Sequence, residues 1–307
     1  MRKFCIVALT GVVSLLAACG VPAGSAVVED IDGLIAATGT GDFDALLAEA
    51  ASQWENRQDN EAVDAAIEAW ETAIHSPTDS AVDRRAAMVP VFTSLAHAYY
   101  WRAHAHLRFD DAATDEDLLF AYSTGMDYAA QAMALNNDEW RRALLYETPI
   151  PEAVVHLTPS DVPAVYWHAT NLGRWGLTRG IATVLGRKDD IYALMNRVEE
   201  MDPAFYYNAT NRYFGVYYTK LPFGNPAVDE SQRRLEECIS RHPEYLETRV
   251  LYAYDWATVT QNRAVAEEQL QIVLDADISQ WPELYPENFN AQRRAERIMA
   301  ELDEYIR

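Results

Sequence analysis

Cysteine is scarce in this chain of 307 residues, which contains only three. Cys5 lies in an apolar segment at the start of the sequence, and Cys19 directly follows that segment, so the remaining body carries Cys238 alone. One cysteine cannot form a disulfide within that body, which excludes a disulfide-stapled fold. A lone cysteine in a helical pattern is more often a small core residue than a nucleophile, and we expect that role for Cys238.

Basic residues are few as well. The chain has 25 Lys and Arg against 47 Asp and Glu, which gives a formal net charge of −22. Such a body repels phosphate backbones, so we expect no nucleic-acid partner. The acidic run over residues 110–117 lacks the central glycine and the terminal glutamate of an EF-hand loop. We expect a solvated loop there, with Thr114 and Asp117 forming a helix capping box.

Long apolar runs are absent except for residues 4–18, which is shorter than the roughly 20 residues that cross a bilayer. Arg2 and Lys3 precede this run, which ends Leu-Ala-Ala before Cys19. The pattern predicts a signal peptide over residues 1–18 and resembles the lipobox of bacterial lipoproteins. That resemblance implies cleavage before Cys19 and acylation of Cys19 as a membrane anchor. Residues 20–28 are small and uncharged, and we expect a tether over residues 19–40. The alternative is an ordinary signal peptide with a coincidental cysteine. Gly20 favours the outer over the inner membrane, so the expected location is periplasmic and lipid-anchored.

Strand signals are nearly absent, and the rest of the chain follows a helical pattern. Small and apolar residues over 61–75 recur at three- and four-residue steps, the spacing of one helical face. Polar turns, often with proline, end these helices, and an aromatic-rich helix usually follows. The pattern predicts an all-α domain over residues 41–307, with a helix over 61–75, four helical pairs and a capping helix. The pairs are expected over 89–136, 162–201, 204–241 and 244–275, and the cap over 288–306.

The spacing of the last pairs approaches the 34-residue tetratricopeptide period. Gly173, Gly215 and Ala253 lie where paired helices would cross closely, each followed by an aromatic residue. We therefore predict a tetratricopeptide-like superhelix of helical hairpins with a central cleft or pore. Residues 147–161 are rich in proline and are expected to form an extended loop between pairs, and residues 221–226 are expected to form a second, shorter loop.

Catalytic motifs are also lacking. We find no Gly-x-Ser-x-Gly elbow, phosphate-binding glycine loop, His-Glu-x-x-His motif or Cys-x-x-Cys pair, so we predict no enzyme activity and no cofactor. His97, His104 and His106 lie on one expected helix, and the first two share a face. A metal site there is conceivable, but buried imidazoles with protein partners are the commoner outcome, so we predict none.

Aromatic residues gather on the first helix of each expected pair. Adjacent aromatics point to different faces of a helix, so packing between helices does not account for all of them. Polar side chains alternate with them, and an apolar wall with a few fixed polar groups is typical of a small-molecule pocket. In an acidic protein, cations in such a groove favour a carboxylate or another anionic group. The predicted ligand-binding residues are Tyr166, Trp167, Asn171, Arg174, Trp175, Asn208, Asn211, Arg212, Arg249 and Tyr254.

Residues 162–277 resemble the T-component lipoproteins associated with TRAP transporters, the TatT-like family. The resemblance is carried by residues 163–176 (PAVYWHATNLGRWG), 194–207, 215–222 and 245–253. It implies a cryptic tetratricopeptide fold with an apolar and aromatic cleft, lined here by Tyr166, Trp167, Asn171 and Trp175. Asn208 and Ala209 stand where relatives tend toward glycine.

The resemblance also implies partners. It predicts a periplasmic helper that docks the substrate-binding P subunit of a TRAP transporter and binds a small hydrophobic or carboxylate ligand. Some relatives form trimers, so a homotrimer is one expected arrangement. The rival hypothesis is a ligand-free repeat scaffold of outer-membrane assembly, which a groove filled by side chains would favour.

Overall fold

The computed structural model describes residues 30–220 and 227–307, and every regular element within these ranges is helical. The prediction of an all-α fold is therefore confirmed. The predicted signal peptide, the acylation site at Cys19, most of the tether and the loop over 221–226 lie outside the described residues. No helix among the described residues has the length and hydropathy needed to cross a membrane.

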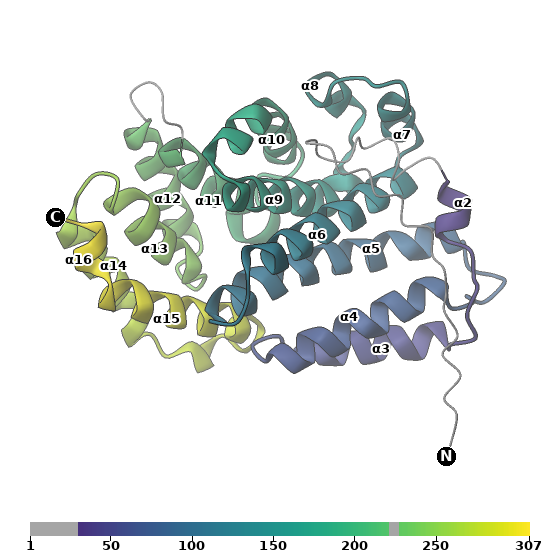
Figure 1. Cartoon of the computed structure of the whole chain (residues 1–307), viewed down its shortest axis with the longest axis horizontal. Helices are drawn as coiled ribbons and strands as arrows, with labels where there is room; N and C mark the ends of the chain where they lie inside the picture. The colour runs from purple at the N-terminus through teal and green to yellow at the C-terminus, as the bar shows by residue number, and fades with distance from the viewer. Residues whose placement is uncertain (1–29, 221–226) are drawn as a thin grey trace, which may run out of the picture.

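The amino-terminal half is a stack of antiparallel helices (Figure 1). A short helix, α2, lies within the range expected for the tether, and its Ile31 packs into the core. Helices α3 and α4 form the first hairpin, and α5 and α6 form the second, much longer one. The bounds are Ile31–Leu34 for α2, Phe43–Trp54 for α3, Asn60–His75 for α4, Arg84–Trp101 for α5 and Asp115–Asn136 for α6.

The carboxy-terminal half continues the stack. Helix α9 packs against both α6 and α10, and α11 pairs with α12. A short helix α13 runs into a π-helix, η5, and α14 and α15 complete the chain with α16. The bounds are Val162–Arg179 for α9, Ile181–Met201 for α10, Phe205–Lys220 for α11, Val228–Arg241 for α12, Glu247–Leu251 for α13, Tyr252–Ala257 for η5, Arg263–Asp275 for α14, Tyr285–Ala300 for α15 and Leu302–Tyr305 for α16.

Local sequence explains where most of these helices begin. The carboxylates of Asp42 and Asp83 accept hydrogen bonds from backbone N–H groups in the first turns of α3 and α5. Thr114 and Asp117 form the predicted capping box at the start of α6. The first expected pair is wrong at its start, because α5 begins at Arg84 rather than residue 89. Pro90 lies inside this helix.

Two further expectations need correction. Residues 147–161 are not an extended loop: they hold α8 (Ile150–Ala153) and two 3-10 turns, η3 (Val154–His156) and η4 (Pro159–Asp161), directly after α7 (Asp138–Leu145). Pro149 and a Thr158–Asp161 capping box begin the first and last of these turns. The last helix begins at Tyr285 rather than residue 288 and breaks at Glu301 before α16.

Buried apolar side chains form two cores. The first extends over α2 to α11, and the second, smaller core extends over α12 to α16 and includes Leu235 and Trp256. Cys238 is fully buried and free, as expected of a small core residue. Gly215 on α11 lets α12 approach closely, because a Cβ at that position would lie 2.6 Å from Leu235 Cγ.

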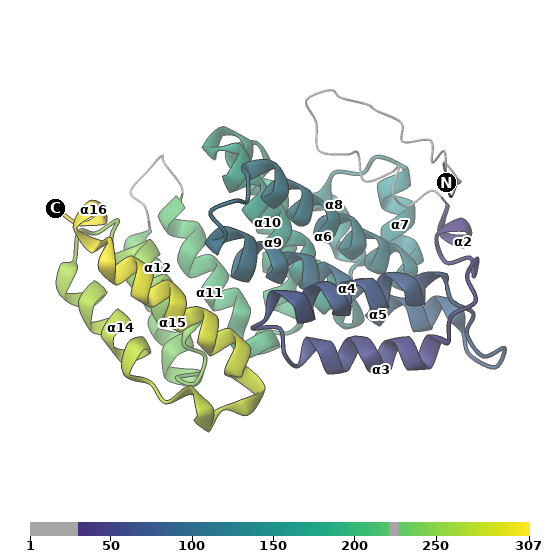
Figure 2. The same cartoon turned by 60° about the horizontal axis from the view of Figure 1, so that its bottom comes forward.

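The last long helix of the stack, α15, contacts the turn between the first two long helices, α3 and α4. Arg57, in the turn between α3 and α4, forms an ion pair with Glu287 of α15, with Nη2 and Oε2 2.7 Å apart. Trp101 Nε1 donates to the carbonyl of Arg57 at 2.7 Å and holds that turn in place. Figures 1 and 2 both show the start of α15 beside the α3–α4 turn. This contact closes the helical arc around an interior in which the candidate site lies.

Candidate functional site

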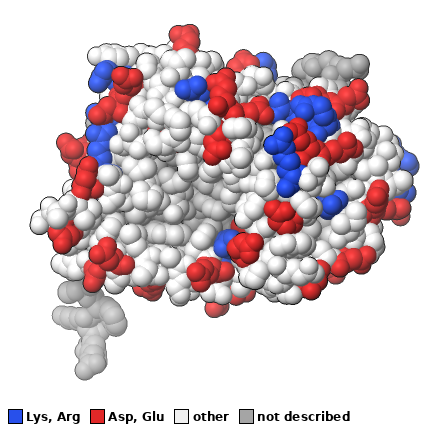
Figure 3. Space-filling view, turned by 180° about the vertical axis from the view of Figure 1, so that it is seen from behind, with Lys and Arg blue, Asp and Glu red and all other residues white. Residues whose placement is uncertain are grey.

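A cavity lies where side chains from both cores face each other. About 120 Å³ of it is open to the centre of a water molecule, on the order of ten times the minimum that holds one water. Helices α5, α9, α10, α11, α13 and α15 each contribute to its lining. The space-filling view of the rear face shows charged side chains mainly toward the margins and an uncharged hollow at the centre (Figure 3).

Aromatic rings form one wall of the cavity. The imidazole of His97 stacks on Trp167 with ring centroids 3.7 Å apart and planes 13° apart. Tyr100 and Tyr206 approach the same indole at 5.4 and 5.5 Å, and Tyr166 lies edge-on to it at 4.9 Å. His97, Tyr100, Trp101 and His104 share one face of α5 and its extension because they recur at three- and four-residue steps. The wall therefore offers broad apolar surface with hydroxyl groups at its edge.

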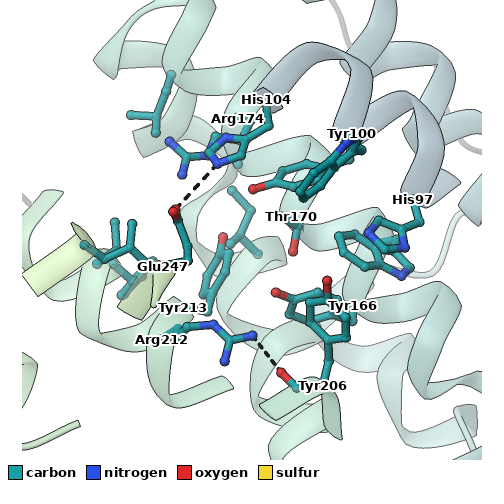
Figure 4. Close-up of a pocket in the computed structure, with 18 of the residues that line it drawn as sticks. His97, Tyr100, His104, Tyr166, Thr170, Arg174, Tyr206, Arg212, Tyr213 and Glu247 are labelled. Carbon is teal, nitrogen blue, oxygen red and sulfur yellow. Dashed lines mark hydrogen bonds and ion pairs between the residues drawn. The ribbon is translucent and has the colours of Figure 1, made fainter. Parts of the chain in front are cut away.

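The opposite end of the cavity is charged. His104 Nε2 lies 3.5 Å from Glu247 Oε1, and the same carboxylate forms an ion pair with Arg294 (Figure 4). Figure 4 also places Arg174 beside His104, with Tyr100 and Tyr213 between the two ends. Burial, with repulsion from Arg294 and Arg174, holds the pKa of His104 well below its usual value. His104 is therefore neutral at pH 7, and the arginines carry the positive charge at this end.

Arg212 holds an unusual backbone turn beneath the cavity. Tyr206, Tyr207 and Asn208 have φ values of 43°, 57° and 56°. These values lie in the left-handed region, which residues other than glycine rarely adopt. The guanidinium of Arg212 donates to the carbonyls of both Tyr206, at 2.6 Å, and Tyr207. It also lies over the ring of Tyr245 at 4.1 Å. The turn directs the ring of Tyr206 into the cavity (Figure 4).

Several polar atoms on the lining lack protein partners. Within the described part of the chain, Thr170 Oγ1, His104 Nδ1, Asn290 Oδ1, His97 Nε2 and Glu247 Oε2 are buried without a hydrogen bond of normal geometry. The side chains of Thr170, His104 and Asn290 are more than nine-tenths buried. A buried polar atom left unpaired costs about 1–3 kcal/mol, and the usual remedy is water or a ligand. The lining thus has unused hydrogen-bonding capacity.

The tyrosines of the lining remain hydroxyl donors. Burial raises the pKa of Tyr206 well above its usual value, and neighbouring Tyr245 and Glu287 raise it further. Burial likewise raises the pKa of Tyr213 and of Tyr245. Tyr206 donates to Glu287 Oε1 at 3.1 Å, which links the cavity wall to the Arg57–Glu287 pair.

Four of the ten predicted ligand-binding residues line this cavity: Tyr166, Trp167, Arg174 and Arg212. A fifth, Tyr254, lines a second, adjacent cavity that shares His104 with the first. These residues come from α9, α11 and η5, so the fold brings the aromatic first helices of three pairs to the same interior.

The other five predicted residues lie outside this lining. Asn171 is fully buried and donates to the carbonyls of Ala96 and Trp167, and Trp175 is buried with Arg179 over its ring. The remaining three bind side chains elsewhere: Asn208 with His242, Asn211 with Arg234 and Arg249 with Gln269. We leave these five out of the proposed site.

Sequence reasoning missed the acids and one helix face. Glu247 and Glu287 lie 40 residues apart on α13 and α15, and no motif connects them. His97 and Tyr100 on α5 and His104 in the segment that follows it share one face, and the helical spacing of the two histidines was a detectable signal for it. Among residues 30–220 and 227–307, no three His, Cys, Asp or Glu side chains gather closely enough to hold a metal ion.

The comparison with family models decides the classification. Residues 111–306, more than half of the chain, match the model of the TRAP transporter T-component. The chain belongs to this family. No match to a curated protein was found. Membership associates this T-component with TRAP transport in the cell envelope, and the family is not one of enzymes. The matched region begins before α6 and includes α9, α11, α13 and α15, which build most of the cavity.

Proposed function

We propose that this T-component is a lipid-anchored periplasmic protein that binds a small amphipathic anion in its interior cavity and docks the P subunit of a TRAP transporter. The supporting observation is the cavity itself. Its lining combines stacked aromatic rings with unpartnered buried polar atoms. A ligand-free scaffold has no need for that capacity, because an interior filled by apolar side chains would be more stable.

The charge distribution supports a ligand with a carboxylate or similar group. Arg174 lines the cavity next to Tyr100 and His104, and its guanidinium has no carboxylate within 4 Å in the described residues. Arg212 has two donor groups committed to the left-handed turn, so Arg174 is the better candidate for the anionic group. The aromatic wall at His97 and Trp167 would take the apolar part.

Octanoate is a suitable probe, with octanol as its uncharged counterpart. Trp167 and Trp101 line the cavity, so binding should change tryptophan fluorescence as well as release heat in calorimetry. We expect saturable binding of octanoate and weaker binding of octanol. Arg174→Met should remove this preference for the charged probe, because its guanidinium would no longer face the carboxylate.

Thr170→Val provides the matched test of the unpartnered hydroxyl. It keeps the side-chain shape and replaces the hydroxyl with a methyl group, so we expect octanoate affinity to fall about two- to tenfold, the value of one hydrogen bond, with no loss of thermal stability. The control is Thr72→Val, whose hydroxyl bonds an exposed backbone carbonyl on α4. Equal affinity in wild type, Thr170→Val and Arg174→Met would contradict ligand binding in this cavity.

Docking and anchoring need separate measurements. We expect the chain to co-elute with the cognate P subunit in size-exclusion chromatography, and sedimentation velocity would show whether it forms a homotrimer. Radiolabelled palmitate should be incorporated by the wild-type chain and not by Cys19→Ala. Separate elution of the two proteins at tens of micromolar would contradict docking, and an unlabelled wild type would contradict acylation.

A further inference from the structure

The second cavity has a different chemistry from the first. About 230 Å³ of it is open to the centre of a water molecule, and its polar lining is dominated by Arg108, Arg294 and Arg297. Arg108 lies in the 3-10 turn η2 (Leu107–Phe109), while the other two lie one helical turn apart on α15. Three guanidinium groups around one cavity are notable in a chain with a net charge of −22.

We call the cavity lined by Arg108, Arg294 and Arg297 the arginine funnel. Arg108 and Arg297 are exposed at its mouth, and Arg294 is 7% exposed and lies deeper, next to His104. Within the described residues, Arg294 uses one nitrogen, Nη1, for Glu247. A guanidinium carries five N–H donors in a planar fork, so the remaining donors of Arg294 are available to an oxyanion.

The carboxylates near this funnel do not pair with all three of its arginines. Glu301 pairs with Arg297 at 3.4 Å and accepts from the hydroxyl of Tyr305 at 2.6 Å. The carboxylate of Glu247 forms an ion pair with Arg294. The side chain of Arg108 has no carboxylate within 4 Å among the described residues. Burial, with smaller contributions from repulsion by Arg108 and Arg174, lowers the pKa of Arg294 to about 9.

Two irregular helical segments shape the cavity. The π-helix η1 (Arg102–His106) brings His104 to the cavity, and the π-helix η5 brings Tyr254 to it. Tyr254 meets Tyr305 edge-on, with ring centroids 5.3 Å apart, and the two rings border the arginines. A π-helix rotates the side chains that follow it relative to an α-helix, and such segments are frequent at functional sites.

We propose that this funnel binds a dianionic oxyanion group, a phosphate monoester or inorganic phosphate. The site is separate from the cavity proposed for the amphipathic ligand, although His104 borders both. Bidentate contacts between guanidinium forks and phosphate oxygens give the charge and geometry that such a group requires. The volume exceeds that of a single phosphate, so the cavity also accommodates the organic part of a phosphorylated compound.

Calorimetry of the full-length protein with inorganic phosphate tests the site, with potassium chloride added to match ionic strength. We expect saturable binding that weakens about tenfold in Arg108→Gln and in Arg297→Gln, since each variant loses charge-assisted hydrogen bonds to the phosphate oxygens. The control, Arg241→Gln, removes the same charge from an exposed position on α12 and should bind phosphate like the wild type.

A second titration with dihexanoyl phosphatidic acid distinguishes the source of the phosphate. Tighter binding of this short lipid, lost in Arg108→Gln, supports a lipid headgroup, and equal affinity for both probes supports a free phosphate. The absence of saturable phosphate binding up to about 10 mM would overturn the proposal, as would equal weakening in Arg241→Gln. Octanoate binding is expected to be unchanged in Arg108→Gln, so failure at one site does not imply failure at the other.

Discussion

The carboxylate of Glu287 is 3% exposed and lies against the guanidinium of Arg57, whose side chain is 12% exposed. This pair joins the last long helix to the first hairpin. Removing one partner of a buried ion pair leaves the other charge unpaired and costs about 3–5 kcal/mol. We therefore expect Glu287→Gln to lower the free energy of unfolding by about 3 kcal/mol in urea denaturation.

The neighbouring acid provides the control for this substitution. Glu283 lies four residues earlier and is exposed, and its side chain makes no ion pair within the described residues. Glu283→Gln should change stability by less than about 0.5 kcal/mol, the usual range for surface substitutions. A loss in Glu287→Gln no larger than in Glu283→Gln would show that the pair does not hold the stack closed.

At this residue scale, the sequence predicted the aromatic members of the cavity better than its charged ones. Tyr166 and Trp167 lie at consecutive positions of an aromatic-rich helix and point to different faces of it. At least one of them therefore lies outside a given interface between two helices. Polar residues gave a weaker signal. Asn211 and Arg212 are adjacent, yet Asn211 bonds Arg234, while Arg212 reaches the cavity and the left-handed turn. Which partner each one finds depends on contacts that sequence spacing does not encode.

At the scale of elements, the close crossing of α11 and α12 gives a sharp prediction. A Cβ added in Gly215→Ala would meet Leu235, which is fully buried, so the helices would have to move apart. Overpacking of this kind costs about 1–3 kcal/mol. Gly186→Ala, inside α10 with open space around it, should instead stabilise the protein by about 0.5–1 kcal/mol. Thermal unfolding followed by circular dichroism measures both shifts, and a destabilised Gly186→Ala variant would contradict this account.

Element ends were predictable where a side chain caps them and not elsewhere. The capping box at Thr114 follows from residue types three positions apart. Helix α5 was predicted to begin too late, at residue 89, although its actual start at Arg84 follows the capping residue Asp83. In the left-handed turn from Tyr206 to Asn208, only Asn208 gave a local signal, because asparagine adopts this conformation more readily than most residues. Tyr206 and Tyr207 gave none, because the turn is held by Arg212 and by packing against Tyr245.

At the scale of the whole molecule, helical pairing was predictable and closure was not. Each hairpin joins neighbours in sequence, so periodicity and turn residues indicate it. The contact that closes the arc joins residues 230 positions apart, Arg57 and Glu287, and depends on the summed geometry of every intervening pair. For that reason the sequence predicted a central cleft but not how deep the cavity is, which acidic residues line it, or that a second cavity lies beside it.

Buried histidines distributed over this interior predict how the whole molecule responds to acid. Burial holds the pKa of His97 and of His104 well below 6.5, and it also lowers those of His106 and His168. Below pH 6.5 the unfolded chain binds protons that the folded chain excludes, so the unfolded state gains stability as the pH falls. Each strongly shifted histidine should therefore remove about 1 kcal/mol of folding stability between pH 6.5 and 5.5.

One carboxyl group opposes this trend. Burial raises the pKa of Asp127 to about 6, so its contribution grows as the pH falls through that value, by less than about 1 kcal/mol over the same interval. The histidines outnumber it, and we expect urea denaturation at pH 7.5, 6.5 and 5.5 to show a net loss of stability toward acid. His97→Gln should reduce that loss by about 1 kcal/mol, because the unfolded chain then gains one proton fewer. His75→Gln, at an exposed position on α4, should leave it unchanged. A stability that is constant or rises from pH 7.5 to 5.5 would mean that water reaches these imidazoles and that the interior is not closed as the Arg57–Glu287 contact requires.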